Sequence, residues 1–169
     1  PAMCAMTAMS LDQLSGGRFI VGLGASGPQV VEGWHGVPYG KPVTRTKEYI
    51  QIMRKIFERE GPVEFDGQMY QMPNQSDGTT GLGKPLKSIL AAATEIPIYT
   101  ASITPAGLRC AGEVADGVFP VWMDPNKYSV LGDAIEQGFE KAGNGKGLKD
   151  FDVAPFVTVA MNDDLDAAF

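Results

Sequence analysis

The chain has 169 residues, a formal net charge of −6 and a hydrophobic fraction of 44%. The acidic balance argues against a nucleic-acid partner, and no apolar run approaches the ~18 residues that a membrane span needs. One histidine, His35, and two distant cysteines, Cys4 and Cys110, exclude the usual zinc sites and the framework of a disulfide-rich secreted domain. We therefore expect a cytoplasmic protein with no metal, no nucleic-acid partner and no membrane partner.

The first 60 residues predict a helix, a buried strand and a second helix. Methionines recur every third residue at the start of the chain and predict a helix that ends at the pair Gly16-Gly17. Residues 19–23 are a short apolar run and predict a buried strand. Residues 44–60 predict an amphipathic helix, which Gly61-Pro62 ends. Its apolar stripe comprises Tyr49, Ile52, Met53, Ile56 and Phe57.

Residues 61–95 predict a hairpin and a loop that interrupt the succession of helices and strands. Residues 63–65 and 68–70 are typical of a β-hairpin joined by a two-residue type I′ turn at Asp66-Gly67. Residues 74–84 are polar, rich in glycine and without a period, so we expect a loop there.

Strands and helices alternate again in the second half. Residues 96–101, 117–122 and 152–160 predict strands. Thr104-Pro105 and Asp124-Pro125 each predict a capping side chain followed by the first residue of a helix. The inward stripes of these two helices comprise Leu108, Ala111 and Val114 in the first, and Tyr128, Leu131, Ile135, Phe139 and Ala142 in the second.

This alternation indicates an α/β fold with a parallel sheet covered by helices. Half of a (β/α)₈ barrel and an open doubly wound sheet both satisfy the pattern. The chain begins inside a predicted helix, and residues 162–164 resemble the cap of another helix that only five residues follow. We therefore expect residues 1–169 to be a single partial domain of a longer protein.

Two glycine-rich segments resemble phosphate-binding loops. Residues 22–27 match the dinucleotide fingerprint, but that fold needs a long helix next, and glycines and prolines interrupt residues 33–42. Residues 78–84 match the P-loop pattern, yet Pro85 stands where a serine or threonine must hold the metal. We therefore disfavour both nucleotide-binding interpretations.

Ligands of parallel α/β folds bind at the carboxyl ends of strands, and three of the predicted ends are chemically distinctive. Their small residues would let a flat ligand approach the backbone, and the helix beginning at Thr104-Pro105 would offer amide donors to an anion. The plainer alternative is that these residues only serve tight turns. The candidate residues are Gly24, Ala25, Ser26 and Gly27 after the first strand, Ala101, Ser102 and Ile103 after the second, and Val121 after the third.

Several longer stretches resemble the luciferase-like monooxygenase superfamily, in the branch that uses the deazaflavin coenzyme F420. The stretches are residues 10–24, 27–36, 65–67 with Tyr70, 96–99 and 115–117. The resemblance implies a (β/α)₈ TIM barrel of which this chain supplies about strands four to seven. It also implies an oxidoreductase that transfers a hydride between F420 and a small organic substrate, in a homo-oligomer. The alternatives are an FMN-dependent monooxygenase and a fragment that does not catalyse.

The resemblance also implies a cofactor site. Residues 24–27 and 101–103 would line the ring system, and Val121 would lie near the cofactor tail. Two positions depart from the family pattern. Some members of the family have an acidic residue after the glycines that follow strand four, but this sequence has Gly27 or Pro28 there. Some also have a lysine that holds the cofactor phosphate, and residues 121–124 contain no lysine. His35 is the only side chain with an ordinary pKa near neutrality, and we assign no catalytic residue.

Overall fold

Four short parallel strands form the sheet, and they lie side by side in the order in which the chain reaches them. The computed structural model describes residues 1–121, 123–164 and 166. The strands, in spatial order, are β1 (Val21–Leu23), β4 (Ile98–Thr100), β5 (Gly117–Val118) and β6 (Asp152–Val153). Each new strand is added at the same edge, whereas a doubly wound sheet reverses its order part-way. Because parallel crossovers are right-handed, this order places the connecting helices on one face, as in a barrel.

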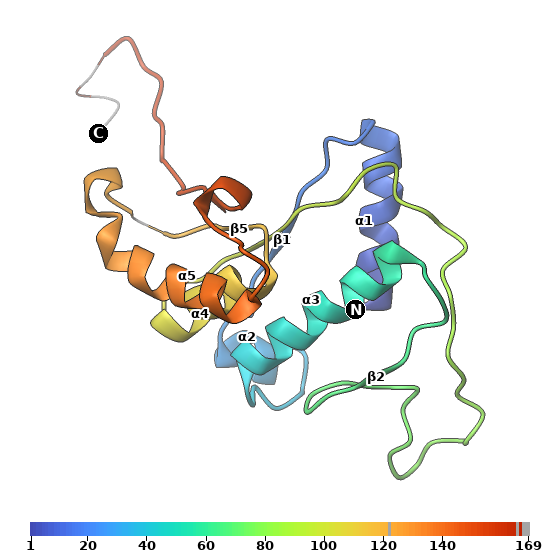
Figure 1. Cartoon of the computed structure of the whole chain (residues 1–169). Coiled ribbons are helices and arrows are strands. Elements are labelled where there is room, and N and C mark those ends of the chain that lie inside the picture. The colour runs from blue at the N-terminus through green and yellow to red at the C-terminus, as the bar shows by residue number, and fades with distance from the viewer. Residues whose placement is uncertain (122, 165, 167–169) are drawn as a thin grey trace.

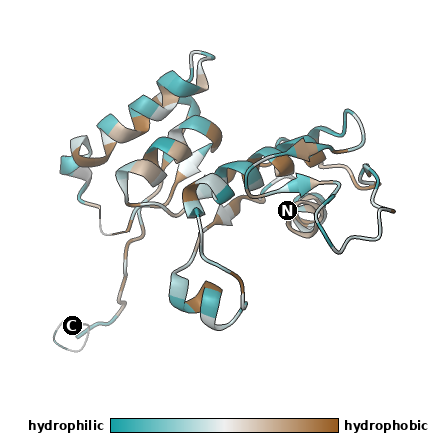
Figure 2. Cartoon of the chain, turned by 90° about the horizontal axis from the view of Figure 1, so that it is seen from below, coloured by the Kyte–Doolittle hydropathy of each residue, from teal (hydrophilic) through white to brown (hydrophobic). Residues whose placement is uncertain are grey.

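Four longer helices and one short helix accompany the sheet (Figure 1). They are α1 (Ala2–Ser15), α2 (Pro28–Gly33), α3 (Pro42–Glu58), α4 (Pro105–Val114) and α5 (Ser129–Ala142), with 3₁₀ turns η1 (Pro125–Lys127) and η2 (Leu148–Asp150). Figure 2 shows hydrophilic and hydrophobic residues alternating along α3, α4 and α5, as amphipathic packing requires. Within the described part of the chain, no helix is long and apolar enough to cross a membrane.

The predicted caps at Gly16 and Thr104 are confirmed by their backbone geometry. The bounds predicted for the helix over 44–60 are wrong: α3 begins at Pro42 and ends at Glu58, where Arg59 adopts the left-handed conformation, before Gly61-Pro62 is reached. Gly16 ends α1 in the left-handed conformation with φ 66°. Thr104 caps α4, and its Oγ1 accepts a hydrogen bond from the Gly107 amide at 3.2 Å. Asp124 also caps a helix, because its Oδ1 accepts from the Asn126 amide at 2.9 Å. That helix is the short turn η1, however, and α5 begins only at Ser129.

Two apolar clusters hold the helices against the sheet. The first joins α1, α3, β1 and β4, and the second joins α4, α5 and β5. Most predicted stripes point into them: Ile52, Met53 and Ile56 on α3, Leu108 and Ala111 on α4, and Ile135 and Phe139 on α5 are buried. The methionine spacing does not mark the buried face of α1, since Met9 is fully buried but Met3 is 83% exposed. Alanines supply the rest of that face, so the helix packs closely.

The predicted two-residue turn at Asp66-Gly67 is wrong. The hairpin consists of β2 (Phe65–Asp66) and β3 (Gln71–Met72), with Phe65 opposite Met72. The turn spans residues 67–70, and the Gly67 amide donates to the Tyr70 carbonyl at 2.8 Å. The wider turn exists because the carboxylate of Glu48, on α3, accepts hydrogen bonds from three amides inside it.

The last two predicted strands pair over fewer residues than the apolar pattern indicated. Among residues 117–121 the structure has a strand at Gly117–Val118 only, and among residues 152–160 at Asp152–Val153 only; residue 122 of the first prediction lies outside the described residues. The ladder ends where the Ala154 amide donates to the Val118 carbonyl at 2.9 Å. Alternation alone cannot make a strand without a neighbouring backbone to pair with. Part of the helix predicted after residue 162 lies outside the described residues.

Candidate functional site

A cavity of about 480 Å³ lies at the carboxyl ends of β1 and β4, beside the first turns of α3 and α4. Its size falls within the range of small-molecule sites. Six of the eight predicted binding residues line it: Gly24, Ala25, Ser26, Ala101, Ser102 and Ile103. The two strand ends therefore share one hollow, although 73 or more residues separate their sequences.

The other two predicted residues lie outside this cavity. Gly27 immediately precedes α2, and Val121 follows β5 with its side chain 47% exposed. Neither is among the residues that line the cavity. Residue 122 lies outside the described residues. The third strand end is thus not brought into the hollow that the first two share.

Small side chains leave the backbone of the strand ends accessible from the cavity. A Cβ placed on Gly24 would lie 3.7 Å from the Cβ of Ala101, so the two residues are neighbours on the same side of β1 and β4. Ser26 adopts a positive φ of 57°, and its carbonyl accepts a hydrogen bond from the Tyr39 hydroxyl at 3.1 Å. That bond connects the turn after β1 to the segment that leads into α3.

Two polar features face this hollow. Thr100 lines the cavity, is only 2% exposed, and its Oγ1 has no hydrogen-bond partner among the described residues. A threonine hydroxyl both donates and accepts, and an unpaired buried hydroxyl is costly. The first turn of α4 also lies here, where helix amides favour negative charge. The cavity therefore suits a ligand that is flat and partly anionic.

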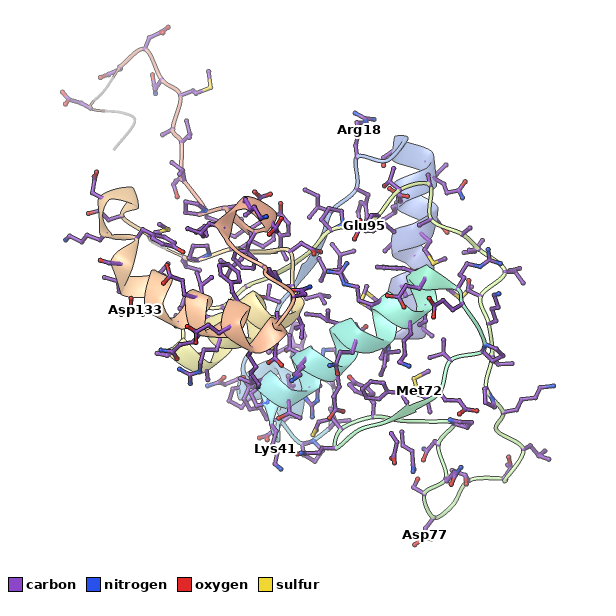
Figure 3. All side chains as sticks on the ribbon, viewed as in Figure 1. Arg18, Lys41, Met72, Asp77, Glu95 and Asp133 are labelled. Atoms are coloured by element: carbon purple, nitrogen blue, oxygen red, sulfur yellow. The ribbon has the colours of Figure 1, made fainter. Side chains whose placement is uncertain are left out.

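A second cavity of about 320 Å³ shares residues 23–26 with the first and extends it toward α2 and the hairpin. It is lined in addition by His35, Arg45, Tyr49 and Tyr70. Burial raises the pKa of Tyr49 and of Tyr70, so both phenols stay neutral near pH 7. Figure 3 shows Asp77, in the loop of the 61–95 segment, lying well away from Lys41, the residue that precedes α3.

Several ionisable side chains near the cavities form structural contacts within the chain. Lys47 and Lys141 pair with Glu113 at 2.6 and 3.1 Å. Burial opposes the charge of Glu113, but the hydrogen bonds and charges of these two lysines outweigh it and lower the pKa of that carboxyl. Burial raises the pKa of Cys110 to about 11, so its thiol is protonated at neutral pH, as expected of a small core residue. No group of three or more His, Cys, Asp or Glu among the described residues could hold a metal ion.

Three structural carboxylates escaped the sequence analysis. Asp12 accepts from the amides of Ala93 and Thr94 at 2.7 and 2.9 Å. Glu48 holds the hairpin turn, and Asp116 accepts from the Ile98 amide at 2.7 Å and pairs with Arg54. An acid inside an otherwise apolar stripe, as at Glu48, is a signal that could have identified one of them.

Comparisons with known proteins identify the family and the fold of this chain. The family model described as luciferase-like monooxygenase matches residues 1–169. A Mycobacterium tuberculosis protein described as a coenzyme F420-dependent oxidoreductase is 43% identical over all of this chain and 49% of its own length. The 5,10-methylenetetrahydromethanopterin reductase of Archaeoglobus fulgidus is 29% identical, over 99% of this chain and 46% of its own.

Among solved structures, the coenzyme F420-dependent tetrahydromethanopterin reductase of Methanopyrus kandleri superposes with a TM-score of 0.79 at 25% identity. The match covers 98% of this chain and 48% of that one. The chain thus spans about half the length of the relatives it matches. The likeness confirms the predicted fold, a segment of a (β/α)₈ barrel, and the strand order agrees with it.

Proposed function

The chain belongs to the luciferase-like monooxygenase family, and from this we propose that its protein transfers a hydride between coenzyme F420 and a small organic substrate. One observation carries the proposal: six small or apolar residues from two distant strand ends line the same cavity. The names of the relatives support F420 in preference to FMN, since the M. tuberculosis protein and the M. kandleri structure are both described as F420-dependent and match nearly the whole chain.

The residues present fit a flat, anionic cofactor. Residues 24–26 and 101–103 would hold its ring system, because their small side chains allow a planar group to reach the backbone. Thr100 lies on the helix-covered side of β4, so its Oγ1 and the first turn of α4 would meet polar groups of the cofactor outside its ring system. When bound, the deazaflavin supplies the hydride chemistry, and the protein supplies binding and orientation.

Proton transfer is not assigned to the positions where the family resemblance places an acid. Pro28 opens α2 and Gly27 precedes it, and neither has a side chain that holds a proton. Among the residues of the second cavity, His35 has an imidazole suited to this work, but it is exposed. We therefore propose that this chain binds and orients the cofactor and does not protonate the substrate from position 27 or 28.

The experiment is a titration of the full-length protein with F420, followed by the fluorescence of the deazaflavin. We expect saturable binding, and hydride transfer to or from F420 without consumption of oxygen. The same protein titrated with FMN, and assayed for oxygen uptake with reduced FMN, provides the comparison. Binding of FMN together with failure to bind F420 would overturn the proposal.

A matched pair of variants locates the binding site. A methyl group at Gly24 makes only ordinary contact with Ala101 but occupies the cavity wall, so Gly24→Ala is expected to weaken F420 binding about tenfold, which is ~1.4 kcal/mol. Gly61→Ala is the control, because a Cβ there meets nothing within 4 Å. Equal affinities for the two variants would place the cofactor elsewhere.

A further inference from the structure

One row of residues crosses all four strands on the side of the sheet opposite the two apolar clusters. Strand register pairs Gly22 with Tyr99, Tyr99 with Gly117, and Gly117 with Asp152. Side chains alternate between the faces of a sheet, so this row faces away from the buried residues on either side of it in sequence. Those neighbours pack against the helices: Val21, Ile98 and Val118.

Tyr99 dominates this row and is held in place at both ends. Its ring lies across Gly117, where a Cβ would stand 2.8 Å from the ring atom Cδ1. Its hydroxyl donates a hydrogen bond to the carboxylate of Asp152, on a strand that does not pair with β4. Burial, followed by the hydrogen bond and charge of Asp152, raises the pKa of Tyr99 to about 12. The phenol therefore remains a donor throughout the physiological pH range.

Phe119 extends the aromatic surface from β5 toward β1. Its ring centroid lies 5.2 Å from that of Tyr99, and a Cβ on Gly22 would come within 3.2 Å of its Cε2. We call Tyr99 and Phe119 the aromatic floor. Glycines at positions 22 and 117 leave room for the two rings, since any side chain there would meet them.

The aromatic floor lies directly beside residues of the strand-end site. Gly24 and Ala101 follow Gly22 and Tyr99 by two positions, so they lie on the same face and nearer the carboxyl ends. The Ala101 amide continues the ladder by donating to the Leu23 carbonyl at 2.8 Å. On this face of the sheet, Gly24 and Ala101 lie at the carboxyl ends of the strands. The rings of Tyr99 and Phe119 lie next to them, further from those ends.

We propose that the aromatic floor sets how deeply a flat cofactor ring lies at the strand ends, and that Asp152 acts as a positioning residue by holding Tyr99. This inference rests on the proposed function, because it concerns the same cofactor. Tyr99 and Phe119 are not part of the cavity lining; they are the next large side chains on the face that Gly24 and Ala101 share, so they would limit how far a ring placed over Gly24 and Ala101 can descend. Without the hydrogen bond to Asp152, the Tyr99 ring is no longer held in one position across Gly117. The aromatic floor then no longer sets a fixed depth for the cofactor ring.

The test uses four variants of the full-length protein. Tyr99→Phe and Asp152→Ala each remove the hydrogen bond, and a double variant removes both partners. Asp152→Asn keeps an amide oxygen that can accept from the phenol. The readouts are the Kd for F420, the absorption spectrum of the bound deazaflavin, and kcat and KM for the substrate.

We expect Tyr99→Phe and Asp152→Ala each to weaken F420 binding about tenfold, because the bound cofactor would then have to order a Tyr99 ring that the hydrogen bond no longer holds. The absorption band of bound F420 should shift in both, kcat should fall, and KM for the substrate should stay unchanged. The double variant should be no worse than either single variant, because both remove the same contact. Asp152→Asn should restore most of the affinity and the original spectrum.

Tyr128→Phe is the matched control, since it also removes a buried tyrosine hydroxyl but lies beside α5, in contact with the second apolar cluster. Its Kd and spectrum should equal those of the wild type. If the wild type binds F420 and the Tyr99→Phe and Asp152→Ala variants have the same Kd and spectrum as the wild type, this inference is wrong and the proposed function stands. The Tyr99–Asp152 hydrogen bond would then be a purely structural contact. Failure of the wild type to bind F420 would overturn the proposed function, and this inference with it.

Discussion

The two faces of the sheet use their polar groups in different ways. On the helix-covered face, Asp12, Glu48 and Asp116 each accept hydrogen bonds from backbone amides of another segment. On the opposite face, the carboxylate of Asp152 has the Tyr99 hydroxyl as its hydrogen-bond partner. The comparison teaches that carboxylates on the first face connect segments of this chain through backbone amides, whereas on the second face a carboxylate fixes the position of a buried side chain, Tyr99.

Glycines also have different roles on the two faces of the sheet. On the helix side, a Cβ on Gly112 of α4 would stand 2.3 Å from the Ile135 carbonyl oxygen of α5, so the residue lets two backbones approach closely. On the other face, Gly117 makes room for the ring of Tyr99. One glycine serves the packing of helices, and the other shapes a surface.

Glu48→Ala should give the largest loss of stability. Three amides of the hairpin turn would lose their acceptor, so we expect the free energy of unfolding to fall by about 3–4 kcal/mol. Urea unfolding of the full-length protein measures this change. Glu64→Ala, at an exposed acid of the same 61–95 segment, should change the stability by less than about 0.5 kcal/mol. Equal effects of the two substitutions would show that the hydrogen bonds of Glu48 to the hairpin turn do not stabilise the protein.

Gly117→Ala should destabilise the protein by about 2–3 kcal/mol, because the new methyl group would overlap the Tyr99 ring and the Asp152 carbonyl. In a Tyr99→Ala background the same change should cost less, since one of the two contacts is gone. Thermal unfolding of the four proteins gives the coupling between the two positions. Strictly additive effects would show that Gly117 does not make room for the ring.

Asp12 should make stability depend on pH in acid. Burial disfavours its charge, but hydrogen bonds from Thr94 and Ala93 outweigh burial and lower the pKa below 3.8. Its contribution is therefore complete above the ordinary value and is lost as the pH falls through the lower folded value. In an Asp12→Asn variant, measured by unfolding at a series of pH values, this part of the acid dependence should be missing. A slope unchanged from the wild type would contradict the assignment.

Tyr128→Phe should have the smallest effect, and of opposite sign. The hydroxyl is buried without a hydrogen-bond partner among the described residues, so its removal should be neutral or stabilise by up to about 1 kcal/mol. Urea unfolding again decides. A clear loss of stability would reveal a hydrogen-bond partner and would place Tyr128 with the satisfied polar groups of the helix-covered face.

Much of the fold could be predicted because its signals are local. The stripes of α3, α4 and α5 follow from helical spacing, and the caps at Thr104 and Gly16 follow from the backbone groups that a helix end leaves unpaired. The turn after β2 could not be predicted, because its geometry depends on a carboxylate about 20 residues away. Strand lengths failed for a related reason, since a strand ends where its partner ends.

By itself the sequence determined most of the helices and the small residues that follow β1 and β4, because periodicity, caps and side-chain size are properties of neighbouring residues. It did not reveal the short helix α2 or the start of α5 at Ser129. The tertiary structure alone decided that the strands lie in chain order, that two of the three candidate strand ends share a cavity, and that Tyr99 reaches Asp152. These facts depend on residues that are far apart in the sequence, 53 positions in the case of Tyr99 and Asp152. Such residues meet only when the strands pair, so no local pattern records which of them will be in contact.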